Sequence, residues 1–67
     1  MEYYVNKRGK VIGRLYECGS GFAAEIGRYS TKAKFCRFFA NKSAKFKTYH
    51  QAENFLFKNG CVSVGIA

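Results

Sequence analysis

The sequence has no aspartate, tryptophan or proline, and it has four glutamates and a single histidine. Acid–base catalysis and zinc binding need carboxylates, imidazoles or thiolates that meet in one site. The glutamates are scattered, His50 stands alone, and Cys18, Cys36 and Cys61 are too far apart for a zinc knuckle. A glycine-rich phosphate loop with its lysine is also missing. We therefore expect no enzyme activity, no metal site and no cofactor.

Long apolar runs are missing as well, so no segment reaches the length needed to cross a bilayer. The first residues, MEYYVNK, are polar and charged, unlike a secretory signal peptide. An odd number of cysteines without such a signal favours reduced thiols that serve packing. These features predict a cytoplasmic protein with no membrane partner.

Positive charge is what the sequence has in excess. The 67 residues, enough for one small domain over 1–67, carry a net charge of +8. Eleven of the twelve Lys and Arg precede residue 48, and residues 28–47 contain seven of them and no acid. Such a field attracts polyanions and speeds their capture.

Strand-forming residues dominate the chain before residue 47, and glycines divide it into segments. We predict strands at 2–7, 10–18, 22–28 and 34–40, with a turn at 6–9 in which Gly9 takes the left-handed conformation. In the third strand Phe22, Ala24 and Ile26 share one face, the alternation of a half-buried strand. Residues 61–66 are a candidate edge strand or a packed tail.

One helix is expected near the C-terminus. Thr48 and Gln51 have the spacing of a capping box, and Asn59-Gly60 is a helix stop. An apolar stripe on this helix is wide enough to cover one face of a sheet. The predicted fold is α+β, a three- to four-stranded antiparallel meander packed on one C-terminal α-helix, with one sheet face left open.

Basic and aromatic residues form the candidate nucleic-acid-binding surface. Arg14 and Tyr16 share a face of the second strand, Tyr4, Asn6 and Arg8 of the first, and Arg37 is expected to point outward between Phe35 and Phe39. A sheet of this kind lies in a duplex major groove, or its aromatic rings stack single-stranded bases. Lysines before the helix add an anion site at its N-terminus, unless they are only a solvated linker. The full candidate set is Lys7, Arg8, Lys10, Arg14, Tyr16, Arg28, Lys32, Lys34, Arg37, Lys42, Lys45 and Lys47.

Two short segments carry a resemblance to a known family. FAAEI at 22–26 and F-x-T-x-x-x-A at 46–52 resemble the plant ethylene-response-factor DNA-binding domain, over about residues 11–56. The arm-binding domains of tyrosine-recombinase integrases are similar. The resemblance implies three antiparallel strands packed on a helix and a sheet that reads the major groove. The chain departs from that family in two ways: it has no tryptophan, and Gly27 stands where the family has a DNA-contacting arginine.

The sequence thus predicts a nucleic-acid-binding protein, with duplex DNA favoured over RNA, of a size that would suit a phage or mobile-element accessory protein. The alternative is a small inhibitor or adaptor that binds an acidic or nucleic-acid-binding surface of a host protein. Steep salt dependence distinguishes the first hypothesis from the second.

Overall fold

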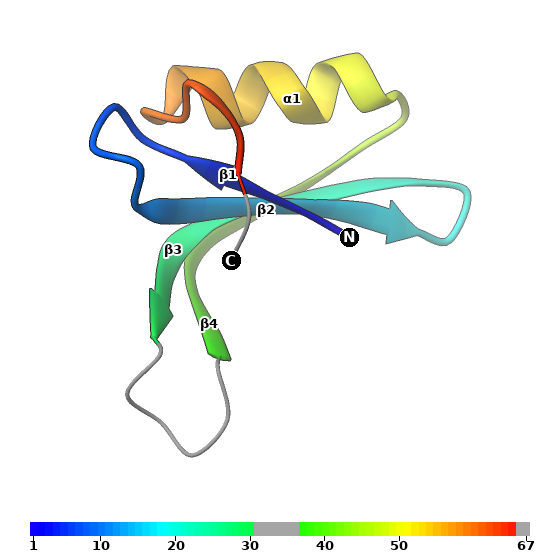
Figure 1. The fold of residues 1–67 in the computed structure, drawn as a ribbon. Coiled ribbons are helices and arrows are strands. Elements are labelled where there is room, and N and C mark those ends of the chain that lie inside the picture. The colour runs from blue at the N-terminus through cyan, green and yellow to red at the C-terminus, as the bar shows by residue number, and fades with distance from the viewer. Residues whose placement is uncertain (31–36, 66–67) are drawn as a thin grey trace.

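The computed structural model describes residues 1–30 and 37–65, which form an antiparallel sheet with one helix across it (Figure 1). The strands lie in the order β4-β3-β2-β1-β5. The elements are β1 (Glu2–Val5), β2 (Val11–Cys18), β3 (Gly21–Ser30), β4 (Arg37–Phe46), α1 (Tyr49–Lys58) and β5 (Ser63–Gly65). The α+β fold is confirmed, with five strands in place of three or four, because residues 63–65 pair with β1 as a short edge strand.

The first hairpin is shorter than predicted, because β1 ends at Val5 and Asn6 begins the turn. The Asn6 side-chain oxygen accepts hydrogen bonds from the backbone N–H groups of Arg8 and Lys10, each at 3.0 Å. Gly9 has φ +78°, the left-handed conformation that glycine adopts without strain. The turn therefore holds its three cations on a fixed loop.

β4 is longer than the predicted strand, and it includes lysines that the sequence pattern assigns to a loop. Residues 34–36 lie outside the described part of the chain, but pairing with β3 continues as far as Phe46. The polar sequence of residues 41–45 fits an edge strand, where charged side chains keep the open backbone from pairing with other chains.

The helix forms as predicted. The Thr48 hydroxyl accepts from the Gln51 backbone N–H, and the Gln51 side chain accepts from the Thr48 backbone N–H, so the capping box is complete. At the other end Gly60, at φ +102°, turns the chain back. Ala52 and Leu56 are fully buried between the helix and the sheet. In the described part of the chain, no helix is long and apolar enough to cross a membrane.

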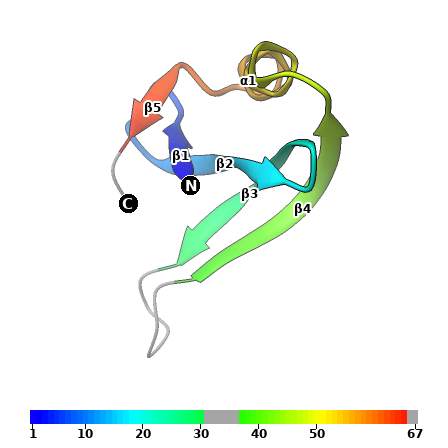
Figure 2. The same ribbon diagram turned by 90° about the vertical axis from the view of Figure 1, so that its right-hand side faces the viewer.

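The core lies between α1 and one sheet face (Figure 2). Its buried side chains are Tyr4, Leu15, Ala24, Ala52, Leu56 and Cys61. The expectation that Tyr4 shares a face with Asn6 and Arg8 is wrong. Tyr4 lies opposite Gly13, is 0% exposed, and belongs to the helix-covered face. Asn6 and Arg8 fall beyond the end of the strand, where alternation no longer holds.

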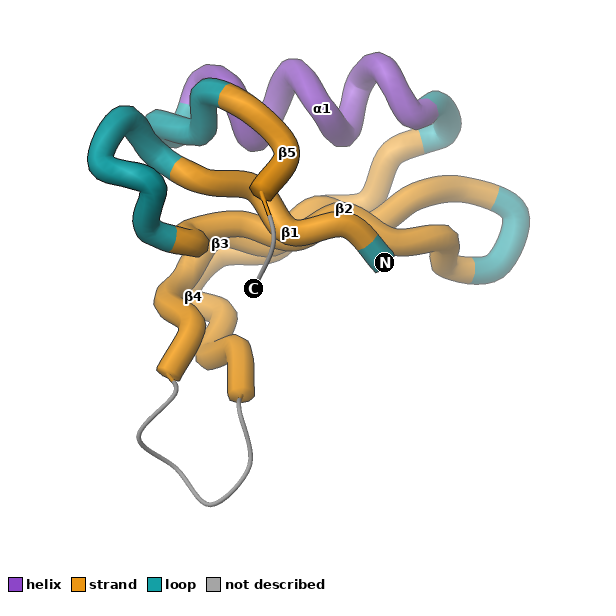
Figure 3. The backbone as a smooth tube through the Cα atoms, viewed as in Figure 1, coloured by secondary structure: helices purple, strands orange, loops and turns teal. Residues whose placement is uncertain are grey.

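The outer parts of β3 and β4 form a two-stranded arm, which we define as residues 27–30 and 37–40. β2 pairs with β3 only as far as Gly13 opposite Ile26, so beyond that point β3 and β4 pair with each other alone. A register shift leaves Asn41 as an extra residue next to Gly27. The arm bends away from the face that carries α1 (Figure 3).

Gly27 is required at the base of this arm. A Cβ atom there would collide with the carbonyl oxygen of Phe39 and lie 2.8 Å from the Cα of Ala40. This close approach of two backbones gives a physical reason for glycine at a position where the resemblance places an arginine.

Gly27→Ala should therefore destabilise the fold, because backbone atoms of β4 must move to admit the methyl group. We expect a loss of about 2 kcal/mol or more in the free energy of unfolding, measured by chemical denaturation. Gly19→Ala is the control: Gly19 has φ +61° and no atom near its Cβ position, so the cost should be only about 1 kcal/mol. Equal losses in the two variants would contradict the close approach.

Candidate nucleic-acid interface

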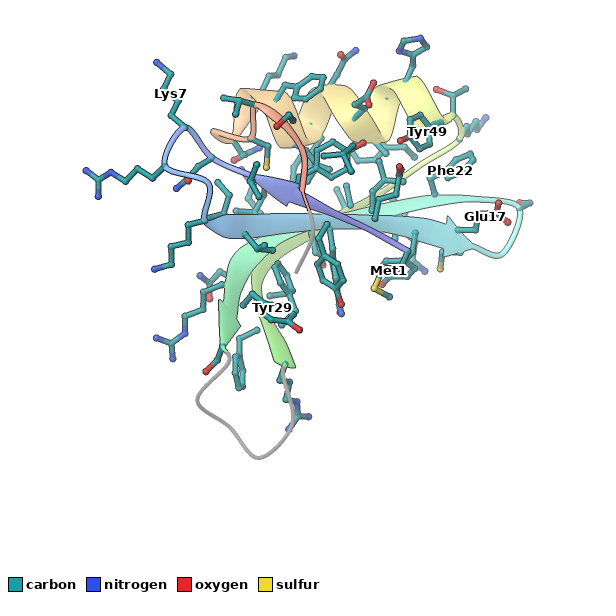
Figure 4. All side chains as sticks on the ribbon, in the orientation of Figure 1. Met1, Lys7, Glu17, Phe22, Tyr29 and Tyr49 are labelled. Carbon is teal, nitrogen blue, oxygen red and sulfur yellow. The ribbon has the colours of Figure 1, made fainter. Side chains whose placement is uncertain are left out.

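The acids of the chain are mostly engaged inside the fold. Glu25 forms an ion pair with Arg14, Glu53 accepts a hydrogen bond from the Tyr4 hydroxyl at 3.0 Å, and Glu2 accepts one from the Tyr49 hydroxyl. Glu17, which is exposed, lies at the end of β2 far from the first turn, as Figure 4 shows by the positions of Glu17 and Lys7. Within the described residues, the Glu25 charge is neutralised by an ion pair, Glu2 and Glu53 keep their charge and accept hydrogen bonds from tyrosines, and Glu17 lies at the end of the sheet away from the arm.

The hydroxyl groups of Tyr4 in β1 and Tyr49 in α1 hold two glutamates, Glu53 and Glu2. Burial raises the pKa of Tyr4 far above its usual value, and the neighbouring Tyr49 and Glu53 raise it further. The hydrogen bond to Glu2 raises the pKa of Tyr49. Both hydroxyls therefore stay protonated and tie glutamates against β1 and α1.

Arg14 and Tyr16 lie on the sheet face that α1 does not cover, as the alternation predicts. The guanidinium of Arg14 stacks 5.5 Å from the ring of Tyr16 and 5.0 Å from that of Phe38. Its side chain is 24% exposed and that of Glu25 is 13% exposed. Burial alone would lower the pKa of Arg14, but the hydrogen bond and the charge of Glu25 more than offset this and raise it. The positive charge of Arg14 is therefore compensated within the fold.

The ion pair between Arg14 and Glu25 could have been predicted from the β2–β3 hairpin turn. Gly19 and Ser20 make a two-residue turn, so residues equally distant from it lie opposite each other, and Arg14 falls opposite Glu25. Opposite charges in facing positions of antiparallel strands attract each other. The ion pair follows from the register of the hairpin.

An aromatic cluster covers the part of the uncovered face next to the arm. Tyr3 packs edge-on against Tyr29 with ring centroids 5.4 Å apart, and against Phe38 at 6.3 Å. Phe38 is only 8% exposed, although no helix covers it. Tyr3 and Phe38 are not among the residues predicted for the site, and they bind the inner side of the arm to β1. The uncovered face is thus partly a second small core.

The outer side of the arm carries Arg28, Arg37 and Phe39. Arg28 lies opposite Phe39 and Arg37 is two residues before it, so all three side chains share one face. The two guanidinium groups lie 5.7 Å and 5.8 Å from the centroid of the Phe39 ring. Arg37 points outward, as predicted. It shares this outer face with Phe39, because Phe38, which lies between them in the sequence, faces inward. Arg14 lies on the opposite face of the sheet. Phe35 lies outside the described residues.

The lysines that precede the helix do not form one cluster. Lys42 lies on the helix side, with its ammonium 5.6 Å from the Phe55 ring, whereas Lys45 lies opposite Ala23 on the uncovered face. Lys47 is exposed beside Thr48, whose hydroxyl already caps the helix. The three lysines therefore lie on different sides of β4, and an anion site at the helix N-terminus stays a prediction. Lys32 and Lys34 lie outside the described part of the chain.

Five exposed cations instead gather at one end of the sheet, which we call the basic end. Antiparallel pairing places the start of β2 and the arm of β3 at the same end, as Figure 1 shows. The basic end consists of Lys7, Arg8, Lys10, Arg28 and Arg37. Within residues 1–30 and 37–65, none of these five forms an ion pair.

Among the described residues, no three His, Cys, Asp or Glu side chains lie close enough together to hold a metal ion. Comparison with known proteins gives no match among protein-family models, curated proteins or solved structures.

Arg14→Ala should behave as a stability variant, because it leaves the half-buried Glu25 carboxylate without its partner. We expect a loss of about 1 to 3 kcal/mol in the free energy of unfolding, against about 0.5 kcal/mol or less for the exposed control Lys45→Ala. The double variant Arg14→Ala/Glu25→Ala should lose less than the two single losses combined, because no carboxylate is then left unpaired. Additive losses in urea denaturation would show that the two side chains do not interact.

Tyr4 makes stability depend on pH in alkaline solution. The unfolded chain releases the tyrosine proton near pH 10, whereas the folded protein keeps it, so the contribution is complete below pH 10 and declines above it. The free energy of unfolding should fall by up to about 1.4 kcal/mol per pH unit there. Tyr4→Phe should lack this part of the decline in denaturation curves at about pH 9 to 11, the window around the ordinary tyrosine pKa. Parallel pH profiles in the two proteins would contradict the assignment.

Proposed function

We propose that this protein binds nucleic acid, duplex DNA in preference to RNA, and that the basic end contacts the phosphate backbone. The observation that carries the proposal is the separation of charge. The glutamates are hydrogen-bonded inside the fold or lie at the opposite end, whereas the five cations of the basic end are exposed without ion-pair partners in the described residues. Uncompensated cations on one surface release counterions from a polyanion and so gain affinity.

The packing of the aromatic rings on the uncovered face favours duplex over single-stranded nucleic acid. A single-strand binder stacks bases on exposed rings. Here Tyr3 and Phe38 of the uncovered face pack within the fold, and the guanidinium of Arg14 covers Phe38 and Tyr16. The exposed cations remain available for the regularly spaced phosphates of a duplex.

The described cysteines fit the cytoplasm, where nucleic acid is accessible and thiols stay reduced. Cys18 and Cys61 are free thiols, and burial raises the pKa of Cys61 above its usual range. A raised thiol pKa keeps the reactive thiolate scarce, so Cys61 serves packing.

The test measures binding of fluorescent duplex DNA, single-stranded DNA and RNA by anisotropy between about 50 and 200 mM salt. For the wild-type protein we expect duplex to bind best, and the logarithm of the association constant to fall linearly with that of the salt concentration. The triple variant Lys7→Ala/Arg8→Ala/Lys10→Ala should reduce the slope by about 0.9 for each phosphate that the removed side chains neutralise in the wild-type complex.

Lys47→Ala is the matched control, since Lys47 is equally exposed but follows the far end of β4. Its salt slope should match that of the wild type. A slope reduced as much as in the triple variant, allowing for the number of charges removed, would place the contact surface along β4. Absence of binding to all three nucleic acids at low salt would overturn the proposal and leave a protein partner as the alternative.

A further inference from the structure

The arm has two faces with different contacts. Its inner face, Tyr29 and Phe38, packs on Tyr3 of β1, and Figure 4 labels Tyr29 on the arm. Its outer face carries Phe39 between Arg28 and Arg37. The inner contacts hold the arm in place, so the outer face is presented in a fixed orientation.

Phe39 is unusually placed for a large apolar side chain. It is 42% exposed on a strand that projects from the sheet, and two guanidinium groups from two different strands lie 5.7 Å and 5.8 Å from the centroid of its ring. A guanidinium carries five N–H donors, and a contact with an aromatic ring leaves donors available for a ligand. The arm thus offers one apolar ring flanked by two forks of free donors.

Two like charges at one ring repel each other, and the described residues of the arm include no carboxylate to compensate them. A ligand that fits this face brings anionic groups on both sides of an apolar or aromatic strip. The major groove of duplex DNA has this arrangement, because phosphates line its rims and base edges, including the thymine methyl group, form its floor.

The two-stranded form of the arm suits that ligand. The major groove is about 12 Å wide and admits a two-stranded β-ribbon. Beyond Ile26 the arm consists of β3 and β4 alone, and it bends away from α1, so the helix does not lie over it. The β1–β2 turn, with its two lysines and one arginine, lies at the same end of the sheet.

We infer that the outer face of the arm enters the major groove of duplex DNA, with Phe39 against base edges and Arg28 and Arg37 bonded to the flanking phosphates or guanines. This inference rests on the proposed function and names the element that performs it.

The experiment compares Phe39→Ala with Phe57→Ala in binding to an A·T-rich duplex. The two phenylalanines are almost equally exposed, at 42% and 43%, but Phe57 lies on the helix. Phe39→Ala should weaken binding on the order of tenfold, and Phe57→Ala by about twofold or less. Circular dichroism and denaturation confirm that both variants are folded.

A second arm of the experiment removes the thymine methyl groups by replacing thymine with uracil in the same duplex. The methyl group lies in the major groove, so its removal should weaken binding by the wild-type protein but hardly affect Phe39→Ala. Arg28→Lys/Arg37→Lys keeps both charges but loses the planar forks. This variant should lose affinity while its salt slope stays close to that of the wild type.

The outcomes separate the two proposals. If the wild-type protein binds none of the nucleic acids, the proposed function fails. If it binds duplex but Phe39→Ala behaves like Phe57→Ala and uracil weakens both proteins equally, the inference about the arm fails while the function stands. If Arg28→Lys/Arg37→Lys binds like the wild type, the donor forks do not contact DNA, which also overturns the inference.

Discussion

The close approach of the β3 and β4 backbones at Gly27 governs the shape of the molecule. The two backbones lie so close together that no side chain fits between Gly27 and the Phe39 carbonyl, and the register shift beside Gly27 leaves Asn41 as an extra residue. Bulges of this kind bend the strand and increase its twist. The bend separates a sheet that packs on α1 from an arm that stands clear of it.

Along the arm, side chains that pack inside the fold alternate with exposed side chains that are candidates for binding. Phe38 points inward and is 8% exposed, whereas its neighbours Arg37 and Phe39 point outward. The inner residues supply the packing that a two-stranded ribbon lacks, since an isolated hairpin is marginally stable in water. The Arg14–Glu25 ion pair lies beneath that packing, so a charged pair at the centre of the uncovered face supports the arm and leaves the binding charge to other residues.

Much of this fold could be predicted from local signals. The capping box of Thr48 and Gln51 defined the helix, and the alternation of Phe22, Ala24 and Ile26 assigned the core face of β3. Local signals could not predict which face of the sheet Tyr4 occupies, or that residues 42–46 belong to a strand. The face of Tyr4 depends on its pairing opposite Gly13, and an edge strand with lysines on both faces has no hydrophobic period to detect. Both depend on long-range pairing, and so does the grouping of the basic end.

Distance along the strands explains why Glu17, at the end of β2, does little to weaken the positive electrostatic field at the arm. Glu17 lies opposite Phe22, and Arg28 is farther along β3 by a path of roughly 20 Å at about 3.3 Å per residue. Charges in physiological salt are screened over about 8 Å, so a separation of this order weakens the influence of Glu17 on the arm. Glu25 is closer to the arm, but Arg14 already neutralises it. The attraction of a polyanion to the arm is therefore set mainly by the five exposed cations of the basic end.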